Sequence, residues 1–175
     1  MGNILFGIAK NKYMGFIVGF LLAYFPFLIP IKKIMQNKKA ISFLHPKPIY
    51  QEHVLIIPRK IAKTIFALTS NDFVAVIDMA IKIRDGNRSD YSLVINGGDR
   101  QDVMQAHFHL FNENLASKKG LHKKQGKAFI PPDEPFWKQV SGNIRDYLLH
   151  NGLSEKSFSM LVQFEADAEP MVYFI

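Results

Sequence analysis

The longest continuous pattern in the chain is an uncharged, apolar run of 18 residues from Met14 to Ile31. A helix needs roughly 17–25 such residues to cross the ~30 Å hydrocarbon core of a bilayer. The pattern therefore predicts an N-terminal membrane-anchor helix within residues 1–37. Two lysines precede the run and four follow it closely, which predicts a cytoplasmic location for residues 38–175. Pro26 and Pro30 leave open a bent or re-entrant element, and a buried helix of a water-soluble domain is the other interpretation.

Beyond residue 38, short apolar segments alternate with turn-forming residues. Strands are expected at 40–44, 53–57, 91–96, 104–111, 158–164 and 171–175, and the last two form a terminal hairpin. Apolar spacing predicts one helix that is capped by Ser70 or Asn71 and ends before Gly86, and a second over 133–151 with Gly152 as its stop. The polar stretch 112–132 is expected to be a long loop. This order favours an α+β fold with a mainly antiparallel sheet and flanking helices.

Composition narrows the function classes. The chain has 175 residues and no cysteine, which fits one domain and excludes disulfides and thiol catalysis. The net charge is +7, but the first 40 residues contain six lysines and no acid, so residues 41–175 are almost neutral. Because the excess charge surrounds the apolar run, we expect no nucleic-acid partner.

The most informative segment is the predicted strand that carries Gln105, His107 and His109. Residues two apart share one face of a strand, so these three side chains are expected to line one site. An imidazole with one nitrogen fixed by a backbone carbonyl presents the other as a nucleophile, and the next imidazole can donate a proton to a bound phosphate oxygen. The H-x-H spacing also suits two zinc ligands, and His45 or His53 could approach in space, but no third ligand is nearby in sequence. We therefore predict no metal site and no cofactor.

These residues resemble the second half of the histidine-triad (HIT) family of nucleotidyl hydrolases and transferases. The family carries Asn-x-Gly followed by Gln-x-Val-x-His-x-His-x-His, and this chain has Asn96-Gly97-Gly98 followed by Gln101-Asp102-Val103-Met104-Gln105-Ala106-His107-Phe108-His109. Upstream, Phe43 to Lys60 is similar to the first-half strand pair, in which a His opens a strand that ends in Ile-Pro-Lys. The resemblance covers about residues 38–112 and implies a HIT-like fold.

The resemblance also implies roles. His107 matches the histidine that attacks the α-phosphorus and forms a covalent nucleotidyl-histidine, and His109 matches the one that contacts the phosphate. Asn96 and Gln101 match residues that bind ribose or phosphate, and His53 matches a buried histidine behind the triad.

Four positions depart from the family, one of which is Arg100 in place of the Gly usual before Gln101. Gln105 replaces the first triad histidine and is expected to support the triad by hydrogen bonding. Asp102 replaces a residue that is often a phosphate-contacting Ser, and an Asp there repels a phosphate unless it is paired, for which Arg100 is the candidate. His45 stands where an Asp commonly binds the ribose.

These features predict a membrane-anchored HIT-like hydrolase or nucleotidyl transferase that acts on a nucleotide-linked phosphoanhydride or phosphoramidate. The anchor suggests a lipid-linked nucleotide as one substrate class, and a homodimer is compatible with the family. The alternative is a catalytically weak or inactive HIT-like nucleotide-binding module, which the changes at residues 102 and 105 favour.

Overall fold

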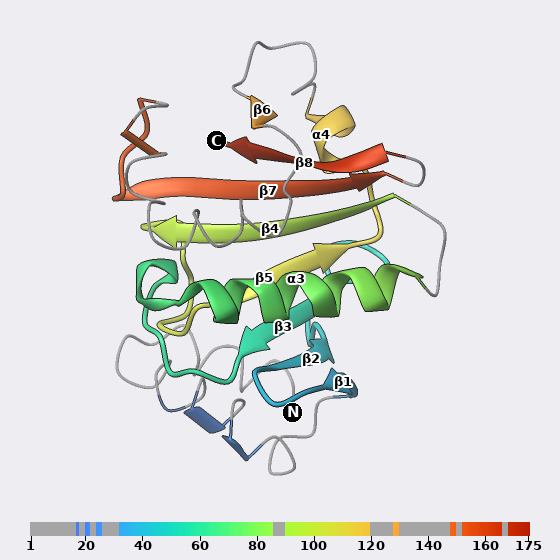
Figure 1. Ribbon diagram of the computed structural model, residues 1–175, viewed down its shortest axis with the longest axis vertical. Helices are drawn as coiled ribbons and strands as arrows, with labels where there is room; N and C mark the ends of the chain where they lie inside the picture. The colour runs from blue at the N-terminus through green and yellow to red at the C-terminus, as the bar shows by residue number, and fades with distance from the viewer. Residues whose placement is uncertain are drawn as a thin grey trace.

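A computed structural model describes residues 32–85, 90–119, 128–129, 148–149, 152–165 and 168–175, together with positions 17, 20, 21, 24 and 25. Its centre is one sheet of eight strands in the order β1-β2-β3-β5-β4-β7-β8-β6, and every neighbouring pair is antiparallel (Figure 1). The α+β prediction with an antiparallel sheet is therefore confirmed. The strands are β1 (Lys33–Gln36), β2 (Ala40–Leu44), β3 (Val54–Pro58), β4 (Tyr91–Gly98), β5 (Phe108–Phe111), β6 (Ala128–Phe129), β7 (Ser157–Glu165) and β8 (Ala168–Phe174).

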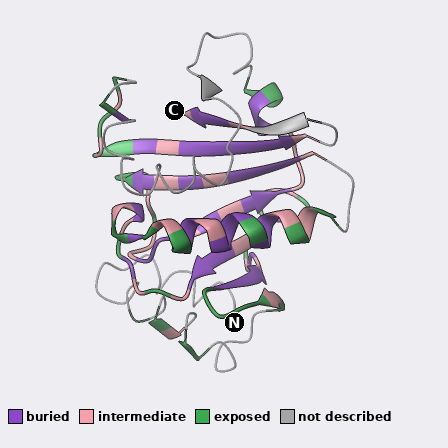
Figure 2. Cartoon of the chain, viewed as in Figure 1, coloured by how far each residue is buried: buried purple, intermediate pink, exposed green. Residues whose placement is uncertain are grey.

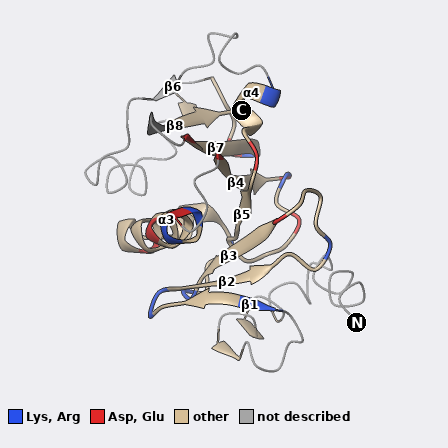
Figure 3. Ribbon diagram, turned by 90° about the vertical axis from the view of Figure 1, so that its right-hand side faces the viewer, with Lys and Arg blue, Asp and Glu red and all other residues tan. Residues whose placement is uncertain are grey.

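Helix α3 (Ser70–Asp85) lies across one face of this sheet (Figures 1 and 3). Alternate residues of the central strands pack beneath it, because side chains two apart point to the same face. Figure 2 shows this layer as the most continuously buried part of the chain. We call the opposite side of the sheet the histidine face. The buried strand residues on the α3 side are Val54, Ile56, Leu93, Ile95, Phe108 and Leu110.

The beginning of α3 differs by one residue from the expectation. Neither Ser70 nor Asn71 is the cap, because Thr69 precedes the first helical residue. The Thr69 backbone N–H and hydroxyl both donate to Oδ2 of Asp72, at 2.8 and 2.7 Å. The Asp72 carboxylate, in the third helical position, therefore accepts from the residue before the helix as the acidic side chain of a capping box does.

The strand expected over 104–111 is wrong in its first half, since β5 begins at Phe108. The Ala106 N–H donates to the carbonyl of Ala62 at 2.7 Å, so the chain before β5 bonds to the loop after β3 and does not continue the ladder. Strand β1 was not predicted at all and lies inside the segment 1–37 that we assigned to the anchor. Strand β1 pairs with β2. The Ser42 hydroxyl accepts a hydrogen bond from the Met35 N–H and donates one to the Met35 carbonyl.

The remaining expectations meet the structure in part. In the described part of the expected loop 112–132 the structure has the short helix α4 (Leu115–Lys118) and the short strand β6, and the 3₁₀ helix η2 (Ile65–Ala67) precedes α3. Most of the predicted helix 133–151 lies outside the described residues. Its end is described: Gly152 N–H donates to Leu149 O and Leu153 N–H to Leu148 O, the bonds of a Schellman motif that stops a helix.

The predicted anchor at 14–31 lies almost wholly outside the described residues. Where the chain is described, no helix is both long and apolar enough to span a membrane.

Two glycines with positive φ allow a matched test of the fold. Gly98 ends β4 at φ +60° and Gly152 follows a helix at φ +66°. A Cβ at Gly98 would lie 2.1 Å from the carbonyl oxygen of Lys156, whereas a Cβ at Gly152 meets nothing within 4 Å. Gly152→Ala should therefore cost only the backbone strain of about 1–2 kcal/mol, while Gly98→Ala should cost about 1–3 kcal/mol more from the steric clash. Urea unfolding of both variants measures the difference, and equal losses would contradict this packing.

Candidate functional site

Strand register brings four histidines together on the histidine face. Leu44 pairs with Val54, which places His45 next to His53 one step further along β2 and β3. Leu55 pairs with His109, so His53 lies diagonally across from His109. His107 precedes His109 by two residues and lies on the same face. The rings reflect this arrangement. The His45 and His53 rings stack with centroids 4.0 Å apart, and the His107 and His109 rings meet edge to face at 4.9 Å.

His107 is held by the backbone immediately before it. Its Nδ1 lies 2.7 Å from the carbonyl oxygen of Gln105. Because a carbonyl only accepts, Nδ1 carries the proton, and the lone pair of a neutral His107 is on Nε2. This is the nucleophilic tautomer.

His109 is held by a chain of hydrogen bonds that starts at the backbone. The Ile49 N–H points at Nδ1 of His53 at 3.4 Å, which leaves the proton of a neutral His53 on Nε2. That Nε2 lies 2.9 Å from Nδ1 of His109 and donates to it. His109 therefore keeps its own proton on Nε2, where it can be donated to a bound group.

Burial keeps these imidazoles neutral. It lowers the pKa of His109 to about 2, with further lowering by His107, His53 and His45. Burial is also the main reason that the pKa of His53 falls to about 3, helped by repulsion from His45 and His107. The pKa of His107 is lowered by burial too, against the raising effects of the Gln105 hydrogen bond and the Asp102 carboxylate. At neutral pH the site therefore offers lone pairs and N–H donors, and no imidazolium charge.

We expected Gln105, His107 and His109 to lie on one face of a single strand. This is wrong for Gln105, because β5 begins only at Phe108. The Gln105 side chain is buried, with 2% exposed, and it bonds to the loop after β3. Nε2 donates to the carbonyl of Lys60 at 3.1 Å, and Oε1 accepts from the Ala62 N–H at 3.3 Å. The chain bends at this position, so the strand geometry that we assumed does not apply.

Three other residues predicted for the site have identifiable contacts. Asn96 is on the histidine face of β4, and its Oδ1 accepts from the Ser159 hydroxyl at 2.7 Å. Gln101 Nε2 donates to the carbonyls of Lys63 and Val103, at 2.6 and 2.7 Å, and so joins two loops. Asp102 is close enough to His107 to raise its pKa.

Arg100, our candidate partner for Asp102, makes its contacts with β7 and the end of the chain. Its guanidinium donates to the hydroxyls of Ser157 and Ser159, each at 3.2 Å, and to the carbonyl of Ile175 at 3.1 Å. Through Ser159 it is linked to Asn96, so Arg100 supports the β4 side of the site.

His45, which the sequence suggested only as a residue that could approach the histidine pair in space, lies in a cluster with two other histidines. One ring nitrogen each from His45, His53 and His109 lie within 4.8 Å of one another. We expected no metal site because a third ligand was missing beside His107 and His109. Two imidazoles of this group, His45 and His53, come from the ends of β2 and β3, and only the register of β3 with β5 could have indicated that they reach His109.

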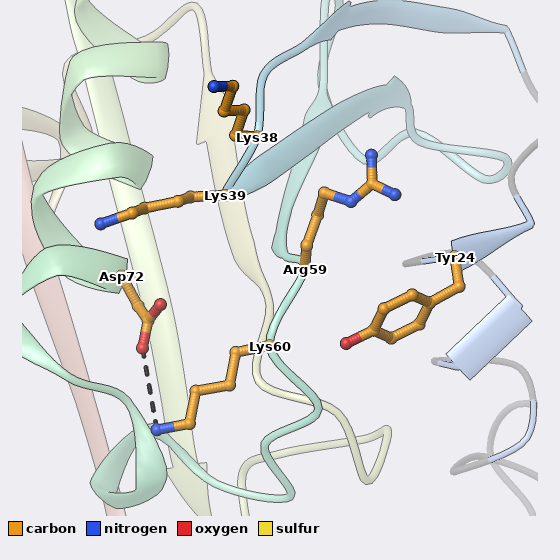
Figure 4. Close-up of a pocket in the computed structure, with 6 residues that line it drawn as sticks. All are labelled: Tyr24, Lys38, Lys39, Arg59, Lys60 and Asp72. Carbon is orange, nitrogen blue, oxygen red and sulfur yellow. Dashed lines mark ion pairs between the residues drawn. The ribbon is translucent and has the colours of Figure 1, made fainter.

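A cavity of about 560 Å³ lies at the ends of β2 and β3 that are farther from the histidines (Figure 4). In Figure 4, Lys60 reaches toward Asp72 of α3, 3.8 Å away, while Arg59 extends away from Asp72 on the side where Tyr24 lies. The cavity thus gathers four basic side chains around one carboxylate. Its lining residues are Tyr24, Lys38, Lys39, Arg59, Lys60 and Asp72.

Comparison with known families shows which family this chain belongs to. The HIT domain matches residues 27–114, which is half of the chain and contains all of the histidine face residues described above. The chain therefore belongs to the HIT-domain family, whose members are typically nucleotide hydrolases or transferases. No curated protein matches the sequence significantly.

Several solved structures are similar to this chain. A HIT-like protein is 23% identical, over 53% of this chain and 94% of its own, with a TM-score of 0.48. A HIT family hydrolase from Legionella pneumophila is 26% identical, over 52% and 87%, with a TM-score of 0.46. A yeast Ap4A phosphorylase in complex with Ap4A covers 88% of this chain and 64% of its own at 14% identity, and its TM-score of 0.56 reflects a shared fold.

The neutral histidines predict that stability depends on pH. The folded pKa values of His53 and His109 are about 3 and about 2, below the ordinary 6.5 of an unfolded chain. As pH falls through 6.5 the unfolded chain binds protons that the folded chain does not, so stability is present above 6.5 and is lost below it. Between pH 7 and 5 the loss should be about 2 kcal/mol per histidine.

Urea unfolding at pH 7, 6 and 5 measures this effect, and the range avoids the titration of ordinary carboxylates. His53→Gln removes one of the two groups and should flatten the dependence. A free energy of unfolding that is constant from pH 7 to 5 in the unmodified protein would show that the histidines are not held neutral.

Proposed function

We propose that this HIT-domain protein is a hydrolase or nucleotidyl transferase that acts on a nucleotide-linked phosphoanhydride or phosphoramidate through a covalent histidine intermediate. The observation that carries the proposal is the hydrogen bond from His107 Nδ1 to the Gln105 carbonyl, because it leaves the Nε2 lone pair for attack. The shared fold with an Ap4A phosphorylase supports a nucleotide substrate.

In the first step, His107 Nε2 attacks the α-phosphorus. A P–N bond forms, and the bond from phosphorus to the leaving group breaks with its electron pair on the leaving group. The His109 Nε2–H donates a hydrogen bond to the phosphoryl oxygen, where negative charge develops. Water, or an acceptor nucleophile in the transferase reaction, then attacks phosphorus and releases His107. Asn96 and Gln101 are proposed to bind ribose or phosphate, with Asp102 beside them and His53 behind His109.

A second candidate function is a nucleotide-binding module with weak or absent catalysis. The observation that favours it is the side chain of Gln105, which bonds to Lys60 and Ala62 and so leaves two histidines in the triad positions. In that case the pocket binds nucleotide but phosphorus is not transferred.

The nucleophile can be tested by trapping the intermediate. The full-length protein, incubated with an α-³²P-labelled dinucleoside polyphosphate and denatured in alkali, should retain label on one histidine. His107→Ala should remove the label and the turnover, because no other group in the proposal attacks phosphorus. His109→Ala should keep the nucleophile but lose about 2.7–4 kcal/mol of transition-state stabilisation, as for one oxyanion donor.

Binding measurements separate the two functions. A labelled adduct whose loss requires His107→Ala supports catalysis, whereas nucleotide binding without adduct or turnover in the unmodified protein would favour the silent module. Turnover that persists in His107→Ala would contradict the mechanism.

We also propose that the N-terminal segment anchors the protein to a membrane, with residues 38–175 in the cytoplasm and a lipid-linked nucleotide as one substrate class. The support is the uncharged run over 14–31 and the basic side chains at the edge of β2 and β3. Basic residues near an anionic leaflet contribute about 1 kcal/mol each to membrane binding. Arg59 and Lys60 would add to the lysines that follow the apolar run.

Deletion at two boundaries tests the anchor without confusing it with the fold. The full chain should sediment with membranes and resist salt and carbonate, whereas deletion of residues 1–31 should release a folded protein that keeps β1. Deletion of 1–37 also removes β1 and the Met35 partner of buried Ser42, so it should be less stable by about 1–3 kcal/mol. Release of the full chain by salt alone would contradict a spanning anchor.

A further inference from the structure

Three imidazoles from two strand pairs converge at one point of the histidine face. His45 follows β2, His53 precedes β3 and His109 is in β5, and one nitrogen of each lies within 4.8 Å of the others. His45 and His53 are 8% and 1% exposed. We propose that His45, His53 and His109 form a binding site for a zinc-class divalent ion.

The donor set determines the class of ion. Three imidazole nitrogens suit Zn²⁺, Co²⁺, Ni²⁺ or Cu²⁺, while Ca²⁺ and Mg²⁺ require oxygen ligands. A neutral imidazole binds a metal through its unprotonated nitrogen, and each of the three residues offers one such atom to the shared point. Three protein ligands leave a fourth position for water or a phosphate oxygen.

Binding requires the His45 ring to turn out of its stack on His53, because an ion lies in the plane of each imidazole that binds it and these two rings are nearly parallel, with centroids 4.0 Å apart. His53 Nε2 and His109 Nδ1 are 2.9 Å apart, and two ligands at about 2.0–2.1 Å in a tetrahedral site are separated by about 3.3 Å. The proton between them must also move. If the ion takes Nε2 of His53, the proton shifts to Nδ1 and the Ile49 N–H loses its acceptor, which is a long bond of 3.4 Å. Binding through Nε2 of His45 requires the same proton shift, because Nδ1 of His45 accepts from the Lys47 N–H at 3.1 Å.

The site does not depend on nucleophilic catalysis, because His107 is not among its ligands. The site does involve His109. Its Nδ1 would bind the ion in place of the hydrogen bond from His53, while its Nε2 would keep its hydrogen. An ion here would place positive charge beside the proposed phosphate position and would favour an anionic ligand.

The test is a zinc titration of the untagged full-length protein against a chromophoric chelator, with Co²⁺ absorption spectra as a second probe. We expect one ion per chain. His45→Phe keeps a ring stacked on His53 but removes its nitrogens, and should weaken binding by about 10-fold or more. His107→Phe makes the same change at the neighbouring histidine outside the site and should change affinity less than 3-fold.

Two further measurements do not depend on the variants folding. X-ray absorption of the zinc-loaded protein should show three imidazole ligands, and zinc should shift the amide resonances of Lys47 and Ile49. Fewer than three imidazoles, no zinc binding, or equal losses in the two Phe variants would overturn the proposal. A variant that loses the covalent adduct but keeps zinc, as expected for His107→Phe, distinguishes this site from the proposed catalytic function.

Discussion

The hydrogen bond from His53 to His109 is the interaction on which the site depends. It joins β3 to β5 through their side chains and fixes which nitrogen of His109 carries a proton. It forms because the antiparallel register puts the two residues diagonally across from each other on the face that α3 leaves open. The Ile49 N–H, at the other nitrogen of His53, gives the pair its direction.

The cost of this arrangement is electrostatic. Four imidazoles share a small, partly buried space, and a charge on one disfavours a charge on the others. Neutral imidazoles are nucleophiles, hydrogen-bond donors and metal ligands, so one physical condition underlies both proposals. They meet at His109, because an ion and the His53 proton compete for the same Nδ1 lone pair. His107 avoids this competition, since its Nδ1 is bonded to the backbone of Gln105.

Much of the fold could be predicted because its signals are local. The strands at 40–44 and 53–57, the helix over α3 and the terminal hairpin each show a clear apolar period between turn residues. The parts of the fold that were predicted wrongly or missed depend on contacts between residues that are not neighbours in the sequence. Strand β1 has only exposed and half-buried residues and exists through its pairing with β2, and the start of β5 is replaced by bonds from Gln105 and Ala106 to a loop more than 40 residues earlier.

The sequence by itself determined the family, through the order of Asn96, Gln101, His107 and His109, and it predicted that the two histidines lie together, because both features are local in the chain. Only the tertiary structure decided what surrounds them. It turned Gln105 into a loop anchor, directed Arg100 toward β7, and stacked His45 on His53 within reach of His109. These contacts join residues that are far apart in sequence, and the strand register that creates them is set by the packing of the whole sheet against α3.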